Sequence, residues 1–148
     1  MRARDLAESA PLVTPDDPIE NAFSNLTSAG LPGIVVNDNG VYTVLPASRT
    51  LRVLLPQYVL DDASLGRVWD EASADALADR LAGRRVSDLV SAMDFSDEDP
   101  EPTVDGDATL VEMAAVMSAA RVPLLAVVDD GRFVGVVTVN RLVRLLMA

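Results

Sequence analysis

The sequence predicts a mixed α/β fold (α+β) in which one βαββα unit occurs twice. Residues 102–131 repeat residues 11–40 without a gap. In each copy an apolar stripe at helical spacing precedes two β-branched runs, and a turn dipeptide, Asn39-Gly40 or Asp130-Gly131, joins those runs. Self-similarity over such a length indicates a duplicated structural unit. Asn-Gly and Asp-Gly between apolar runs are typical of β-hairpins.

Composition excludes several classes of function. The 148 residues suffice to bury a core without disulfides. Cysteine and histidine are both absent, which excludes thiol nucleophiles, imidazole bases and the usual zinc ligands. All twelve basic residues are arginine, and the net charge of −11 argues against a nucleic-acid partner. The richness in alanine, valine and aspartate is typical of a high-GC bacterial gene.

The sequence contains no sign of membrane insertion or export. Its apolar runs fall short of the ~20 residues that span a bilayer. The first residues lack the apolar core of a signal peptide. We therefore expect a cytoplasmic protein.

The first unit is expected to occupy residues 1–55. Asp17 as a cap and Pro18 at the first helical position predict the start of a helix, which Gly30 ends. Ser48 is expected to cap the last helix. The predicted elements are an amphipathic lead-in (residues 3–6), a strand (11–14), a helix (18–29), two strands (33–36 and 41–45) and a helix (48–55).

Residues 56–85 predict a connecting helix. From Asp61 to Arg85 apolar residues recur at helical spacing, so we expect one helix of about five turns. Trp69 lies on the apolar stripe, where a packing anchor is the commoner role and a ring that stacks on a ligand is the alternative.

The second unit is expected to occupy residues 86–148. Residues 86–89 resemble residues 3–6, and eight additional residues then fall within the acidic stretch 93–101. An EF-hand calcium loop beginning at Asp97 would need Gly and Glu where Pro102 and Ala108 stand, so we expect a solvated acidic loop. After the turn, Arg132 is interpreted as one additional residue relative to the first unit.

The second unit carries the more complete motif. Val122-Pro123 opens a strand that leads to Asp129-Asp130-Gly131, and Gly135-Val136-Val137-Thr138 then leads into a helix. This order resembles the cystathionine-β-synthase (CBS) domain, and two copies in tandem resemble a CBS pair, or Bateman module. In the first unit, Thr43 and Pro46 replace the glycine and threonine of the motif.

The resemblance implies two sheets that face each other about a pseudo-two-fold axis, with clefts between the copies. Such clefts commonly bind adenosine compounds: AMP, ADP, ATP or S-adenosylmethionine. The resemblance also implies a homodimer that assembles through its helices, and a separate enzyme or transporter as the regulated partner. The positions that correspond to ligand contacts are Thr14, Pro32, Ser48 and Arg49 in the first unit and Asp105, Val122, Pro123, Thr138, Asn140 and Arg141 in the second.

Arg49 and Arg141 depart from the family pattern, which has an acceptor for the ribose hydroxyls at this position. Arginine only donates hydrogen bonds, so Ser48 or Asn140 would have to supply that acceptor. In the first turn of a helix, a guanidinium also favours a phosphate or carboxylate. The alternative is an ordinary ion pair with one of the many carboxylates.

Two functions are therefore weighed. The first is a non-catalytic regulatory module that needs no cofactor and senses an adenosine compound or another small anion, with the second copy as the better site. The second is an interaction or dimerisation protein whose clefts no longer bind nucleotides. An enzyme is the weakest hypothesis, because no nucleophile and base can be paired without His, Cys or Lys.

Overall fold

The computed structural model describes residues 1–70, 75–76, 79–92 and 100–148. The first copy consists of β1 (Leu12–Val13), α2 (Ile19–Ala29), β2 (Gly33–Asp38), β3 (Val41–Pro46), α3 (Ala47–Thr50) and the 3-10 turn η1 (Leu51–Val53). The second copy consists of β4 (Thr103–Val104), α7 (Leu110–Ala120), β5 (Leu124–Asp129), β6 (Arg132–Thr138) and α8 (Val139–Leu146). Lead-in helices α1 (Ala3–Leu6) and α6 (Val86–Ala92) precede the copies, and α4 (Gln57–Asp61) and η2 (Ala63–Val68) lie between them.

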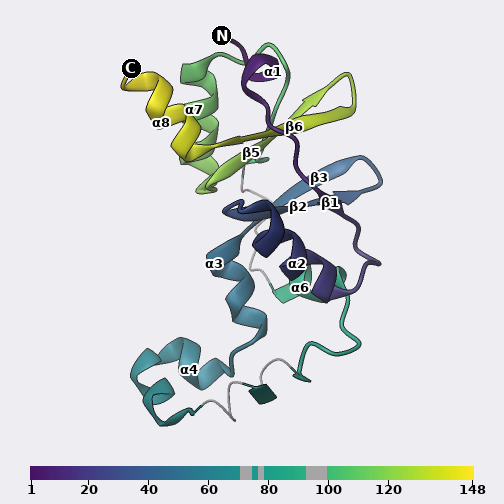
Figure 1. Ribbon diagram of the computed structural model, residues 1–148, viewed down its shortest axis with the longest axis vertical. Coiled ribbons are helices and arrows are strands. Elements are labelled where there is room, and N and C mark those ends of the chain that lie inside the picture. The colour runs from purple at the N-terminus through teal and green to yellow at the C-terminus, as the bar shows by residue number, and fades with distance from the viewer. Residues whose placement is uncertain (71–74, 77–78, 93–99) are drawn as a thin grey trace.

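The strands of the described residues form two three-stranded sheets, ordered β1-β2-β3 and β4-β5-β6. In each sheet the first strand is parallel to the second, and the second is antiparallel to the third. Figure 1 shows the two sheets stacked, with α2 and α6 outside the first and α7 and α8 outside the second. The predicted mixed α/β fold with a duplicated βαββα unit is confirmed.

The two hairpins form where the turn dipeptides predict them. Asn39 and Gly40 have φ of 51° and 88°, and Asp130 and Gly131 have φ of 51° and 76°. A turn with positive φ at both central residues matches the twist of the flanking strands. The predicted helix stop at Gly30 is also confirmed, since this residue is left-handed with φ of 65°.

The predicted starts of two helices are wrong in detail. Pro18 is the N-cap residue of α2, and the Asp17 carboxylate accepts the Thr14 N–H at 2.9 Å instead of capping the helix. This bond closes the loop between β1 and α2. The helix α3 begins at Ala47, whose N–H donates to the Pro32 carbonyl at 2.9 Å. Ser48 therefore lies inside the first turn and does not cap the helix.

The additional residue of the second hairpin is not Arg132. Arg132 pairs with Asp129 as Val41 pairs with Asp38, so the hairpin ends correspond directly. The register shifts one step later, where Val127 pairs with Gly135 and Val128 with Phe133. Val134 is thus the unpaired residue of a β-bulge, which absorbs the insertion without changing the turn.

The connecting stretch is not one helix from Asp61 onward. The helix α4 ends at Asp61, and the next residue, Asp62, has φ of −142° and a side chain that accepts the Ser64 N–H at 3.1 Å to start η2. Trp69 follows η2 in extended conformation and is partly buried. A residue with a short acidic side chain favours such a local cap over the helix interior. The predicted acidic loop falls mainly on residues 93–99, outside the described residues.

Each lead-in helix packs into the opposite copy. The Ala3 N–H donates to the Ala108 carbonyl and the Val86 N–H donates to the Asp17 carbonyl, both at 2.9 Å. Leu6 belongs to the core of the second copy, and Leu89 to the core of the first. The sequence units 1–55 and 86–148 therefore do not coincide with the packing units. Their use as domain boundaries stays a prediction.

A third cluster joins the two sheets. Its buried members are Val35, Val44, Leu124, Ala126 and Val136. Tyr42 and Phe133, which occupy equivalent places in the two hairpins, stack with ring centroids 5.6 Å apart. The copies thus share an apolar interface as well as exchanged helices, and we expect them to unfold together.

Replacing Leu89 by Ala tests this shared core. Leu89 is fully buried in α6 but packs in the first copy, so Leu89→Ala should lower the free energy of unfolding by about 2–5 kcal/mol in one transition. Urea denaturation followed by circular dichroism measures it. The control Val111→Ala removes a side chain that is 73% exposed and should change stability by less than about 0.5 kcal/mol. Two separate transitions would contradict the shared core.

Candidate functional site

A cavity of about 1090 Å³ lies between the two copies. One wall comes from the β2–β3 turn, β3 and α3 of the first copy, and the other from the segment before β4, the end of α7 and β5. Val90 of α6 completes the lining. The lining residues are Gly40, Val41, Tyr42, Thr43, Val44, Arg49, Val90, Pro100, Glu101, Pro102, Thr103, Ala119, Ala120, Arg121, Val122 and Val128.

The cavity combines an apolar wall with two guanidinium groups. Valine side chains of both copies and Tyr42 supply the apolar surface. Among the lining residues, Arg49 and Arg121 are cationic and Glu101 is anionic. A concave apolar site with a few charged groups is the usual form of a small-molecule site, and an excess of arginine favours an anion.

Two of the residues predicted from the resemblance lie at this cavity, Arg49 and Val122. They come from different copies, so the cavity requires the two copies to be packed together. Arg49 lies in the first turn of α3 and is partly buried. Val122 precedes Pro123 at the start of β5 and also packs against the cluster between the sheets.

Pro32 and Pro123 position the helices that follow the hairpins. The Pro32 carbonyl accepts the Ala47 N–H, and the Pro123 carbonyl accepts the Val139 N–H, each at 2.9 Å. These equivalent bonds fix where α3 and α8 leave their sheets. The first turn of each helix, with Arg49 or Arg141, is thereby held at the end of the sheet.

The other predicted residues make local contacts. The Thr138 hydroxyl caps α8 by accepting the Arg141 N–H at 3.3 Å, and an Asp105 carboxylate oxygen accepts the Asp107 N–H at 2.8 Å. Thr14 is exposed and its N–H is bonded to Asp17. Ser48 and Asn140 are exposed.

Arg141 is bonded within the chain. Its Nη1 lies 3.3 Å from Oε1 of Glu8, which belongs to the segment after α1. Its Nε–H is buried and donates to no acceptor among the described residues. Arg49 lines the cavity between the copies, and its equivalent Arg141 contacts a carboxylate of the segment after α1.

Arg121 was missed by the sequence reasoning. It ends α7 in the left-handed conformation, with φ of 55° and ψ of 44°. The equivalent residue of the first copy is Gly30, which takes the same conformation without cost. A non-glycine residue in this conformation costs about 1–2 kcal/mol, and such strain is concentrated at functional sites. The substitution of glycine by arginine between the two repeats was the available signal.

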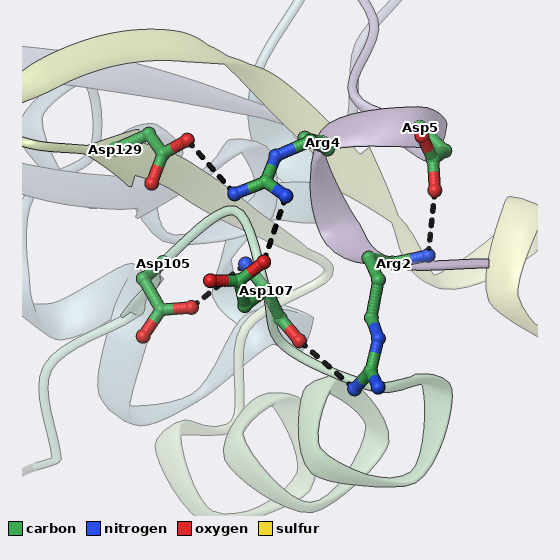
Figure 2. Close-up of polar contacts among 6 residues, drawn as sticks. All are labelled: Arg2, Arg4, Asp5, Asp105, Asp107 and Asp129. Atoms are coloured by element: carbon green, nitrogen blue, oxygen red, sulfur yellow. Dashed lines mark hydrogen bonds and ion pairs between the residues drawn. The ribbon is translucent and has the colours of Figure 1, made fainter.

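A second polar cluster ties α1 to the second copy. Figure 2 shows Arg4 between Asp107 and Asp129, with Nη1 2.7 Å from Asp107 Oδ1 and Nη2 3.2 Å from Asp129 Oδ2. These hydrogen bonds, to Asp107 first and then to Asp129, raise the pKa of Arg4 above its ordinary value. Arg4 therefore stays charged wherever the protein is folded.

Carboxylates of this cluster are held by arginine and by backbone N–H groups rather than arranged around a cation. Arg2 donates from its side chain to the Asp107 carbonyl at 3.1 Å, and its N–H donates to Asp5 at 2.9 Å. Within the described residues, no group of three or more acidic, histidine or cysteine side chains is arranged to hold a metal ion. The cluster anchors a helix.

Comparison with known proteins identifies the fold family. The model of the CBS domain matches residues 86–148. The crystal structure of a CBS domain-containing protein of unknown function from Kribbella flavida is 41% identical to this chain, with a TM-score of 0.79. The alignment covers 100% of this chain and 99% of that one. The chain belongs to the CBS-domain family. With its two copies it is a CBS pair, as the sequence motifs indicate.

More distant CBS structures share the fold. The CBS domain of a membrane protein from Sphaerobacter thermophilus has 20% identity and a TM-score of 0.68, covering 98% of this chain and 87% of that one. CBSX2 in complex with AMP has 20% identity and a TM-score of 0.63, covering 99% and 96%. A search of curated proteins found no match. No helix among the described residues has the length and apolar character needed to cross a membrane.

Replacing Arg121 by glycine tests two properties of this residue, its backbone strain and its positive charge. Arg121→Gly relieves the left-handed strain of a side chain and should raise the free energy of unfolding by about 0.5–1 kcal/mol. It also removes one of the two cations of the cavity, so binding of an anionic ligand should weaken. Urea denaturation and calorimetric titration measure the two effects. Arg121→Ala, which keeps the strain and removes the charge, is the control. Loss of stability in the glycine variant would contradict this view of Arg121.

Proposed function

We propose that this CBS pair is a non-catalytic regulatory module that binds a small anionic ligand, with an adenosine nucleotide as the first candidate. The observation that carries the proposal is the cavity between the copies, with Arg49 and Arg121 among its lining residues. The absence of histidine, cysteine and lysine from the sequence supports a role in binding rather than in catalysis.

The cavity suits a ligand with a planar apolar part and an anionic part. Tyr42, Val41 and Val128 offer apolar surface, and a volume near 1090 Å³ accommodates a nucleotide. The AMP complex of CBSX2 supports an adenosine compound. Because Arg49 only donates, its partner in the ligand is expected to be a phosphate or carboxylate oxygen rather than a ribose hydroxyl.

A ligand in this cavity contacts both copies, which provides a route for regulation. Binding that is tighter in one relative arrangement of the copies shifts the population toward it. The regulated target is proposed to be a separate enzyme or transporter in the cytoplasm, and the module itself a homodimer.

Titration of the wild-type chain tests the ligand. AMP, ADP, ATP, S-adenosylmethionine and inorganic phosphate are compared by thermal shift and calorimetry. A ligand present at 100 times its Kd should add about 2.7 kcal/mol and raise Tm by roughly 5–10 °C. Arg49→Gln should weaken binding about tenfold or more through loss of a charged hydrogen bond. Arg52→Gln, an exposed residue outside the cavity lining, is the matched control.

Failure of every compound to raise Tm would favour the second function, an interaction protein without a nucleotide site. Exposed apolar residues support that alternative. On α8 and just after it, Val143 is 51% exposed, Leu146 51% and Met147 80%. Apolar helix faces of this kind are typical of contacts between protein chains.

The homodimer is tested separately. Light scattering at micromolar concentration should give twice the chain mass for the wild type, and the chain mass for Val143→Asp, because a carboxylate would be buried without a partner. Val68→Asp places the same charge on a side chain that is 87% exposed in η2, and this control should remain dimeric. A wild-type monomer would contradict the proposed assembly.

A further inference from the structure

The two clefts of this CBS pair are built differently. We infer that the cleft beside Arg141 is closed by residues 7–10 of the same chain, here named the strap, which leaves one ligand site in each chain, at Arg49. The count of ligand sites rests on the proposed function, whereas the closure rests on backbone contacts alone.

The strap pairs with β6 as a short additional strand. The Glu8 N–H donates to the Val136 carbonyl at 2.9 Å, and the Val136 N–H donates to the Glu8 carbonyl at 2.8 Å. Ala10, at the end of the strap, packs against the cluster between the sheets. The equivalent stretch of β3 is a wall of the open cavity.

Gly135 permits this pairing. A Cβ atom added at Gly135 would clash with the Glu8 carbonyl oxygen and would come within 2.9 Å of the carbonyl carbon. By register, Gly135 pairs with Val127 as Thr43 pairs with Val36, so Thr43 is its equivalent in the first copy. The threonine side chain would obstruct a backbone at the same place over β3.

The second lead-in also takes a different path. Ser91 follows Val86 by the same number of residues by which Glu8 follows Ala3. It remains inside α6, where its hydroxyl donates to the Ser87 carbonyl at 2.9 Å. Within the described residues up to Ala92, the second lead-in therefore does not cross to β3 as the strap crosses to β6.

Glu8 supplies an anion to the closed cleft. Its carboxylate lies 3.3 Å from the Arg141 guanidinium, and the two side chains are 48% and 42% exposed. Arg141 and Arg49 hold equivalent places, since the α8 and α3 starts are fixed by equivalent bonds to Pro123 and Pro32. The contact between Glu8 and Arg141 thus indicates that an arginine at this position binds an oxyanion.

Hydrogen exchange and binding stoichiometry test the closure. In the wild type, the Glu8 and Val136 amides should exchange about 100-fold more slowly than in an unstructured peptide. Glu8→Pro removes the N–H that pairs with Val136, and Gly135→Ala places a Cβ against the Glu8 carbonyl. Either variant should raise exchange at Val136 about tenfold or more, while the Val127 amide in β5 stays protected. Ser9→Ala, which lies within the strap and keeps both backbone bonds of Glu8, is the control.

Calorimetry with AMP then counts sites. The wild type and Ser9→Ala should bind one AMP per chain, and Glu8→Pro should bind a second. Two equivalents bound by the wild type, or an unprotected Glu8 amide, would overturn the inference while leaving the proposed function in place. Protected amides together with no binding of AMP, ADP, ATP, S-adenosylmethionine or inorganic phosphate would refute the proposed function and support the closure. Glu8→Pro does not alter the sequence of β6, so it still tests the closure if Gly135→Ala does not fold.

Discussion

The fold depends on the exchange of lead-in helices between the two copies. Two backbone bonds of the same length, from Ala3 to Ala108 and from Val86 to Asp17, hold each helix against the other copy. Leu6, which precedes the first copy in the sequence, packs in the core of the second copy, and Leu89, which precedes the second copy, packs in the core of the first. Because of this exchange, the inter-copy cavity has a defined shape: its two walls cannot separate without opening both cores.

The duplication also shows how one framework produces two different clefts. The framework bonds are symmetric, since Pro32 and Pro123 hold the following helices in the same way. The differences lie at a few positions, chiefly Thr43 against Gly135 and Gly30 against Arg121. Small changes in backbone access and charge, rather than changes in architecture, therefore distinguish the open cleft from the closed one.

Most of the fold could be predicted from local patterns, because the hairpin dipeptides and the repeat are properties of neighbouring residues. The lead-in exchange could not, since it depends on contacts between residues 105 positions apart (Ala3 and Ala108) and 69 positions apart (Asp17 and Val86), which no periodicity encodes. The position of the bulge at Val134 is decided by strand pairing, and Asp62 caps the 3-10 turn η2 where the apolar stripe favoured one continuous helix. At the site, Arg49 and Val122 followed from the family motif, whereas Arg121 and the Glu8 contact required three-dimensional packing.

The connecting segment, residues 56–85, differs from the two copies that it joins in its position and exposure. In Figure 1, α4 lies at the end of the molecule remote from both termini, and in this segment Tyr58, Leu65 and Val68 are exposed. The inter-sheet cluster includes none of the described residues of this segment, whereas Leu81, near its end, packs against the core of the first copy. In physical terms the two halves behave as subunits of a heterodimer, and the segment is a tether that raises their effective concentration. A cut at Asp62, between α4 and η2, would leave the inter-sheet cluster and the backbone bonds of both lead-in helices in place.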